Sequence, residues 1–395
     1  GLVLGVPPAH RRRHAQVGMR LTARRLNRAT LARQLLLRRE PLQVAEAVRR
    51  VVALQAQEAA SPYLALWNRL AAFDPAALDA AFAGHEVIKA TLMRLTLHAV
   101  TAADYPAFHC AMVESLRAAR LSDRRYTQTG LSAADADALI PHLVEFTAER
   151  RTNAECEALL NARLGADQPR AWWALRTFAP VVHAVTGGPW SFGYRPSYLA
   201  APFPDHAPDG REACVQQLAR RYLEGFGPAS AADIAQFTLL TRSAARDVLD
   251  AMAGQLERLE GPDGSVLFDV PGAPLPGEDT PCPPRLMAMW DSVLLAYADR
   301  SRVIPPAYRA LVIRRNGDVL PTLLVDGHVA GVWRPAGGGI EATAFRELPE
   351  RAWQELAEEA RALVSFLAAR DPAVYRRFAH WWKELPAAEV RLLPG

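Results

Sequence analysis

Apolar residues recur every three or four positions over most of the first 270 residues, and this period predicts helices. Thr22 is placed to cap a helix that extends to about residue 39, where Glu40-Pro41 ends it. A second helix is predicted at 41–54. Ser61-Pro62 combines a capping residue with a proline at the first helical position, so a further helix is expected to begin there.

The pattern changes at residues 85–100, which are rich in Val, Ile, Thr and Leu in loose alternation and therefore predict strands. Helices followed by a small β-ribbon are the outline of a winged helix, predicted here for 19–130. Helical periodicity returns at about 104–120 and 132–164. APVVHAV and WSFGYRP, separated by Thr-Gly-Gly-Pro, then indicate a second ribbon, so a second winged helix is predicted for 131–210.

A third unit, at 211–275, has the clearest pattern. Ser230 and Thr241 are placed to cap the two helices of a helix-turn-helix, and LERLEGPDGSVLFDV follows as strand, turn and strand. Arg242 and Arg246 lie four residues apart and share one helix face. Such a unit binds DNA or serves as a scaffold, and the pattern does not decide between the two.

Residues 271–284, rich in proline and glycine, predict a linker, and the pattern beyond them is that of strands. Asn316-Gly317 and Asp326-Gly327 are hairpin signals, and a terminal helix is expected at about 349–369. The hairpin at 316–332 either probes a duplex or closes a small barrel. The predicted fold class is mainly α with α+β elements, and it ends in a β-rich domain at 285–395.

Composition limits the class of protein. The chain has 395 residues, enough for several modules, and its apolar runs are far shorter than the ~18 residues that span a membrane. In residues 1–18 the apolar stretch precedes the arginines, so we expect a poorly ordered extension and not a signal peptide. The four cysteines are scattered without metal-ligand spacing, which favours a cytoplasmic chain with reduced thiols, no metal and no cofactor.

Charge is unevenly distributed. Residues 19–50 hold nine Arg and two Glu, whereas the whole chain has a net charge of +4. This basic front end indicates either a polyanionic partner such as nucleic acid or a solvated arginine-rich helix face. Lysine is scarce, with Lys89 and Lys383 against 44 arginines, so few amines are present for Schiff-base chemistry.

Gln55 and Gln57 stand where the apolar stripe of the second helix should continue. On a continuous helix their side chains would point about 200° apart, but in an extended segment residues i and i+2 share a face. The pair therefore converges only if the helix ends at about Leu54. Neutral amides can hold a water or bind a base or sugar edge, whereas the alternative is a polar helix end.

Three stretches carry a family resemblance: LNRATLARQLLLRRE (26–40), VVALQAQEAASPYLALWNRL (51–70) and IKATLMRLTLHAVTAADYPAF (88–108). With the later winged-helix segments they resemble the AlkZ-type winged-helix DNA glycosylase family, from Met19 to near the C-terminus. The family's Gln-apolar-Gln motif matches Gln55-Ala56-Gln57, and a sister subfamily has Asp where Gln57 stands. The resemblance extends to the family's namesake, the azinomycin-resistance protein, so identity with it or close kinship is expected.

The resemblance implies three tandem winged helices and a β-rich C-terminal domain around a DNA-sized channel. It also implies a monomer that acts on double-stranded DNA as a monofunctional, metal-free glycosylase. The expected reaction is hydrolysis of the N-glycosidic bond of N7-alkylated purines, including unhooking of interstrand crosslinks, with Gln55 and Gln57 positioning the water at C1′. Without the resemblance, the sequence equally fits a non-catalytic DNA-binding or drug-sequestering regulator.

Several cationic residues are candidate DNA contacts. Arg94 and His98 lie on the first predicted wing, and the alternative for them is a surface arginine and a structural histidine. Arg300 and Arg302 follow an apolar run, either in a DNA-facing loop or in an ion cluster between domains. The full candidate set is Arg24, Arg25, Arg28, Arg94, His98, Arg242, Arg246, Arg300 and Arg302.

Overall fold

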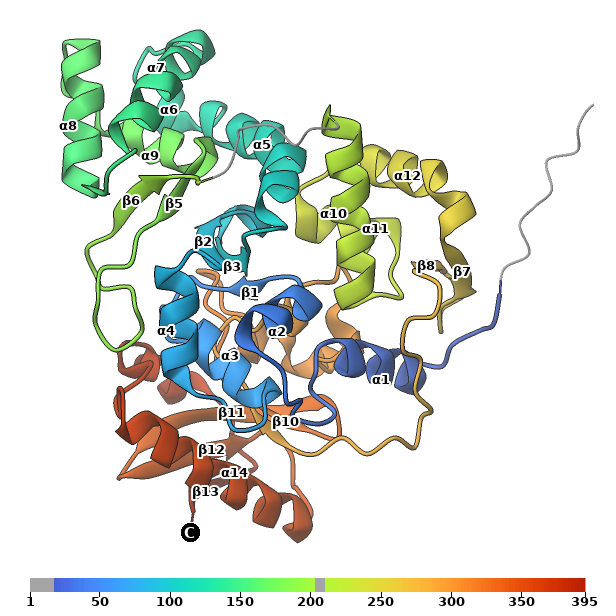
Figure 1. Cartoon of the computed structure of the whole chain (residues 1–395). Coiled ribbons are helices and arrows are strands. Elements are labelled where there is room, and N and C mark those ends of the chain that lie inside the picture. Colours follow the sequence, from blue (N-terminus) through green and yellow to red (C-terminus); the bar gives the residue numbers. More distant parts are fainter. Residues whose placement is uncertain (1–17, 203–209, 395) are drawn as a thin grey trace, which may run out of the picture.

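The computed structural model describes residues 18–202 and 210–394 (Figure 1). Residues 1–17 of the predicted N-terminal extension lie outside the described part of the chain. Helices predominate, and the strands form small sheets. Two units repeat the same order of elements along the chain, a helix, a short strand, two helices and two strands, and a third unit follows this order with a single bridge in place of the short strand.

The first unit lies at the centre of Figure 1 and contains α2 (Val44–Val51), β1 (Leu54–Gln55), α3 (Ser61–Arg69), α4 (Pro75–Ala83), β2 (Val87–Thr91) and β3 (Leu97–Thr101). The second contains α7 (Ala133–Phe146), β4 (Arg151–Thr152), α8 (Asn153–Leu164), α9 (Pro169–Phe178), β5 (Val181–His183) and β6 (Ser197–Ala200). Between them lie α5 (Tyr105–Leu121) and α6 (Arg124–Thr127). In both units the first strand pairs with the last, giving sheets in the order β1-β3-β2 and β4-β6-β5.

The third unit contains α10 (Gly210–Phe226), α11 (Ala231–Thr238), α12 (Arg242–Ala251), β7 (Glu257–Glu260) and β8 (Val266–Asp269). Its first strand is reduced to a bridge between Ala229 and Phe268 of β8. A parallel bridge from Arg20 to Glu260 brings the segment before α1 (Ala23–Arg33) onto the edge of this sheet. The front end of the chain therefore packs on the third unit, and α1 contacts α10.

The C-terminal part is built on a five-stranded antiparallel sheet in the order β13-β12-β11-β10-β9. Its strands are β9 (Arg285–Leu286), β10 (Thr322–Val325), β11 (His328–Ala336), β12 (Gly339–Ala344) and β13 (Glu389–Leu393). The helix α14 (Glu350–Ala368) contacts three of these strands. Short helices complete it: η3 (Ser292–Leu294), η4 (Arg300–Arg302), η5 (Pro306–Tyr308), α13 (Arg309–Val312) and η6 (Arg376–Glu384).

Local signals predicted many of these elements correctly. Thr22, Ser230 and Thr241 cap α1, α11 and α12 through their side chains. The strands at 85–100, the third ribbon and the terminal helix are also confirmed. The turn at Asp326-Gly327 joins β10 to β11, as expected.

The predicted bounds of some other helices and strands were wrong. The helix after Thr22 ends at Arg33 and does not reach residue 39, because the chain adopts a positive φ of 56° at Leu35. The predicted helix at 132–164 is two helices, because Thr152 and Glu155 form a capping box that begins α8. WSFGYRP forms no strand, and β6 begins after it.

Two large hydrophobic clusters divide the interior. One joins α2, α3 and α4 to the C-terminal sheet and α14, and we call it the lower core. The other joins α5, the second unit and the third unit, and we call it the upper core. The segment after α2 lies between them, since Val52 and Ala53 belong to the upper core and Leu54 and Ala56 to the lower.

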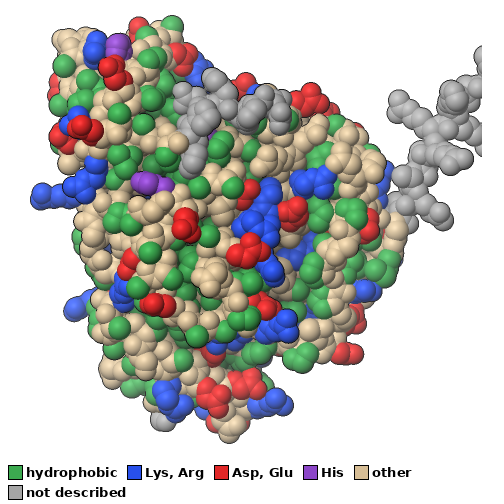
Figure 2. All heavy atoms as spheres, viewed as in Figure 1, with side chains coloured by type: hydrophobic (Ala, Val, Ile, Leu, Met, Phe, Trp, Pro, Cys, Tyr) green, Lys and Arg blue, Asp and Glu red, His purple; other side chains and the backbone are tan. Residues whose placement is uncertain are grey.

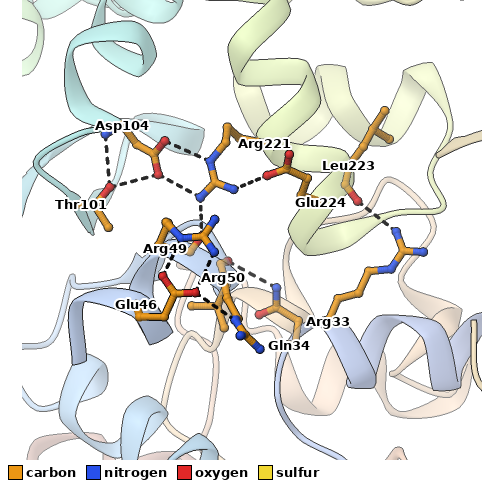
Figure 3. A network of polar contacts seen from close by, with 11 residues as sticks. Arg33, Gln34, Glu46, Arg49, Arg50, Thr101, Asp104, Arg221, Leu223 and Glu224 are labelled. Carbon is orange, nitrogen blue, oxygen red and sulfur yellow. Dashed lines mark hydrogen bonds and ion pairs between the residues drawn. The ribbon is translucent and has the colours of Figure 1, made fainter. Parts of the chain in front are cut away.

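Polar contacts join segments that lie far apart in the sequence, and Figure 3 shows one such network around Arg221. Arg221 of α10 donates to both carboxylate oxygens of Asp104, each at 3.0 Å, and Thr101 donates to the same carboxylate at 3.1 Å. Arg69 of α3 makes a bidentate pair with Asp291 at 2.7 and 2.8 Å, with both side chains almost fully buried. The Arg69–Asp291 pair fixes α3 to the segment that leads into η3.

Loss of the Asp291 carboxylate should lower the stability of the folded protein. In Asp291→Ala the Arg69 guanidinium stays buried without its counter-charge, so we expect the free energy of unfolding to fall by about 3–5 kcal/mol. The double variant Arg69→Met/Asp291→Leu should recover most of this loss. Denaturant titration measures both. Glu355→Ala, which breaks the exposed pair with Arg351, is the control and should cost under about 0.5 kcal/mol.

Candidate functional site

The segment that carries the two glutamines leaves the helix at a strained turn. α2 ends at Val51, and Val52 adopts φ 75° and ψ −54°, a conformation that β-branched residues rarely take. The chain is extended beyond it. Leu54 and Ala56 are buried in the lower core, so Gln55 and Gln57 lie on the opposite face of the segment. The condition for convergence, a helix that ends before the glutamines, is met.

Backbone donors orient both amides. The side-chain oxygen of Gln55 accepts a hydrogen bond from the Gln57 backbone nitrogen at 2.9 Å, and that of Gln57 accepts from Leu97 at 3.4 Å. Gln55 is buried and Gln57 is exposed. Within the described residues neither side-chain nitrogen donates a hydrogen bond, so both NH2 groups are free to bind a ligand.

Both glutamines line one open pocket of about 610 Å³, which we call the QAQ pocket. Its other walls come from distant segments: the β2–β3 turn, the Asn316-Gly317 turn and η6. Trp290 donates its indole hydrogen to the Gly317 carbonyl at 2.8 Å and so fixes that turn. The pocket is lined by Gln55, Gln57, Leu95, Thr96, Trp290, Asn316, Gly317, Asp318, Arg377, Phe378 and His380.

The turn between β2 and β3 is strained and carries Arg94. Arg94 and Leu95 both have positive φ, of 57° and 62°. In the amide orientation that satisfies both neighbours, Gln236 accepts from the Arg94 guanidinium and donates to the Leu295 carbonyl at 3.1 Å. Burial lowers the pKa of Arg94. Burial also lowers the pKa of Arg300 to about 10, and repulsion by Arg94 and Arg309 adds to it. These three arginines therefore form a cationic group beside the turn.

His98 lies next to Gln55 but does not line the QAQ pocket. It pairs with Gln55 across β1 and β3, is 1% exposed, and packs edge-on against Phe237. Burial lowers the pKa of His98 to about 4, and the nearby Arg94 charge adds to the effect. The imidazole is neutral at pH 7, with Nδ1 3.1 Å from the Thr96 carbonyl. The enclosed side chain favours the alternative of a structural histidine, and a contact of His98 with DNA stays a prediction.

The arginine-rich front end is mostly committed to intramolecular ion pairs. Of its nine arginines, all but Arg25 have a carboxylate within ion-pair distance in the described part of the chain. Arg28 is fully buried and bound to Asp326, and its predicted DNA contact stays a prediction. Arg24 pairs with the same carboxylate at 2.7 Å. Figure 2 shows acidic and basic side chains interspersed on this face of the molecule.

The remaining candidate arginines differ in how exposed their side chains are. The side chain of Arg302 is buried, stacks on Tyr297 at 4.0 Å and donates to the Pro228 carbonyl at 2.8 Å, and its predicted DNA contact stays a prediction. Its loop is an interface between units, one of the two alternatives left open by the sequence. Arg242 and Arg246 are exposed on α12. Their predicted role stays a prediction.

Sequence reasoning missed part of the pocket wall. Arg377 and His380 reach the pocket from η6, more than 300 residues beyond the glutamines. The stretch RRFAHWW, basic and aromatic together, was the available signal. Among the described residues no cluster of three potential metal ligands is present. No described helix is long and apolar enough to cross a membrane.

The low pKa of His98 makes a testable contribution to stability. The unfolded side chain takes up a proton near pH 6.5, whereas the folded one does so only near pH 4. The unfolded state therefore binds more protons across this window, and the free energy of unfolding falls as pH falls from 6.5 to 4, by up to about 3 kcal/mol from His98. Denaturant titrations of wild type and His98→Phe should show this slope reduced in the variant. Parallel slopes would contradict a buried neutral imidazole.

A family model described as DNA glycosylase AlkZ-like matches residues 48–366. The fold matches the structure of Streptomyces sahachiroi DNA glycosylase AlkZ with a TM-score of 0.76, covering 90% of this chain and 99% of that one. The two sequences are 20% identical, so of the two expected relationships to the family's namesake, being that protein or being related to it, the match supports the second. Among curated proteins there was no significant match. Since the family model spans most of its length, the chain belongs to the AlkZ-like DNA glycosylase family.

Proposed function

We propose that this protein excises N7-alkylated purines from double-stranded DNA by hydrolysis of the N-glycosidic bond, with Gln55 and Gln57 holding the attacking water. The observation that carries the proposal is the presence of both amides in one open pocket, with each side-chain oxygen oriented by a backbone donor. Membership of the glycosylase family supplies the reaction class.

The chemistry suits neutral amides. Alkylation at N7 makes the purine cationic, so the bonding electrons of the C1′–N9 bond leave with the base and neutralise it, and no strong acid is needed. The sugar becomes oxocarbenium-like, and a water held at C1′ adds to it and releases one proton to the solvent, which completes the hydrolysis, as in glycoside cleavage. Each amide has two donors and a carbonyl with a second lone pair. Their contribution is positioning, which converts a bimolecular attack into a unimolecular one.

We further propose that the three repeated units are winged helices that line a DNA-sized channel. Support comes from their shared element order and from sheets in which the first strand pairs with the last. In the third unit, α12 stands where the second helix of a helix-turn-helix reads DNA, and it carries Arg242 and Arg246. Arg94, Arg300 and Arg309 would contact phosphates beside the QAQ pocket.

The proposed substrates include bulky lesions and interstrand crosslinks. A crosslinked base cannot swing out of the helix into a closed pocket, as ordinary glycosylase substrates do. An open pocket lined by several separate chain segments avoids this requirement. Unhooking by a monomer that leaves an abasic site would give a producer of a DNA-alkylating compound resistance to its own product.

Removing either amide should slow the chemical step. Gln55→Ala and Gln57→Ala are each expected to lower the single-turnover rate of base release from duplex DNA with one N7-methylguanine by roughly 10²-fold, because the water loses a fixed partner. Binding of the same duplex should change little. Gln217→Ala, at an exposed glutamine of α10, is the matched control and should keep the wild-type rate.

The same assay tests the alternative function. A non-catalytic DNA-binding or drug-sequestering regulator would bind alkylated duplex and release no base. Full activity in both glutamine variants would instead leave a glycosylase with a different mechanism.

Arg242 and Arg246 should contribute to affinity through phosphates. Each Arg→Ala variant is expected to weaken duplex binding at low salt and to reduce the slope of log K against log salt by about 1, since one counterion fewer is released. Fluorescence anisotropy at several salt concentrations measures both. Arg361→Ala, at an exposed position on α14, provides the control. Unchanged slopes in both variants would exclude α12 from the DNA interface.

A further inference from the structure

A second recess opens beside the QAQ pocket and shares Gln57 with it. Its volume is about 450 Å³, and it lies among β2, the β5–β6 loop and the segment before η6. A group attached to a base at Gln57 can therefore extend into the recess without crossing protein. Aromatic residues of the β5–β6 loop, Trp190, Phe192 and Tyr194, supply much of its wall.

Lys89 presents its amine to this recess. The side chain is 6% exposed, and within the described residues it makes no hydrogen bond or ion pair. Its ammonium nitrogen lies 4.5 Å from the centre of the Phe192 ring. Burial lowers the pKa of Lys89 to about 8. Burying a cation without a carboxylate partner costs free energy. A ligand that supplies a hydrogen-bond acceptor lowers this cost.

The aromatic wall is held rigidly. Ser191 donates to Asp79 at 2.9 Å, and Arg370 donates to Asp79 at 2.7 Å and to the Pro189 carbonyl at 2.9 Å. The Trp190 ring packs on Tyr63 at 5.1 Å. These contacts fix the β5–β6 loop, seen in Figure 1 as the long green loop, to the first unit and the C-terminal part. Tyr194 nevertheless stays 99% exposed at the recess.

We propose that this recess binds the part of the substrate that is not DNA: a planar apolar substituent on the alkylated purine whose hydrogen-bond acceptor meets the Lys89 ammonium group. The inference rests on the proposed function and adds a substrate class to it. The ring stacks on the wall beside Phe192 and Tyr194, and an oxygen of the substituent completes the coordination of Lys89. Cationic substituents are disfavoured by the same charge.

Three duplex substrates separate the parts of the proposal: N7-methylguanine, N7-(2-phenylethyl)guanine and N7-phenacylguanine, which adds a carbonyl to the ring. Lys89→Met should lower kcat/KM for the phenacyl adduct by about tenfold, because one charge-assisted hydrogen bond is lost. It should leave the other two substrates near the wild-type rate. Tyr194→Ala should slow both aromatic adducts and spare N7-methylguanine.

A second lysine provides a matched control for Lys89→Met. Lys383→Met makes the same change at an exposed lysine and should alter none of the rates. Equal losses on all three substrates in Lys89→Met, or no loss on any, overturn the proposal. A borohydride-trapped DNA adduct that disappears in Lys89→Met would also overturn it, because the amine would then act as a nucleophile. If the wild type releases none of the three bases, the proposed function itself fails.

Discussion

The structure depends on the reversal of the chain at Val52. The positive φ of Val52 ends α2 and directs the next residues between the two hydrophobic cores. The turn fits only because α10 has glycine at position 225, where a Cβ would lie 2.5 Å from a Val52 methyl. Gln34 adds a hydrogen bond to the Gly225 carbonyl at 2.7 Å. Three segments, separated by up to about 190 residues, thus combine to place Gln55 and Gln57 at the junction between the upper and lower cores.

The distribution of charge shows why composition misleads about partners. The surplus of arginine in residues 19–50 suggested a cationic surface, yet most of these arginines pair with acids from distant parts of the chain. Arg33 pairs with Asp269 and Arg39 with Glu359, separations of more than 200 residues. These two ion pairs connect separate parts of the fold. Arg94 and Arg300, which have no carboxylate partner within the described residues, were among the sequence candidates. The sequence could not separate them from Arg28 and Arg302, because the folded neighbours decide which arginines are paired.

The sequence was informative where structure is local. Side-chain caps depend on three or four consecutive residues, and the caps at Thr22, Ser230 and Thr241 were predicted correctly. The end of α1 was not, since tertiary contacts of Arg33 and Gln34 override the helical period there. From the sequence, the two glutamines could be singled out. It also followed that their side chains share a face only if the helix ends at about Leu54. The pocket around them could not, because Asn316 and His380 approach Gln55 only through long-range packing.

The two amides are held differently, and this suggests a division of labour in the proposed reaction. Gln55 is buried, and its oxygen accepts the Gln57 backbone hydrogen at 2.9 Å, so it fixes the conformation of the segment as well as facing the pocket. Gln57 is exposed and is held by one long contact of 3.4 Å. It also lines the QAQ pocket and the recess of Lys89. Gln57 is therefore the amide that can adjust to the substrate, while Gln55 supplies the rigid reference against which the water is placed.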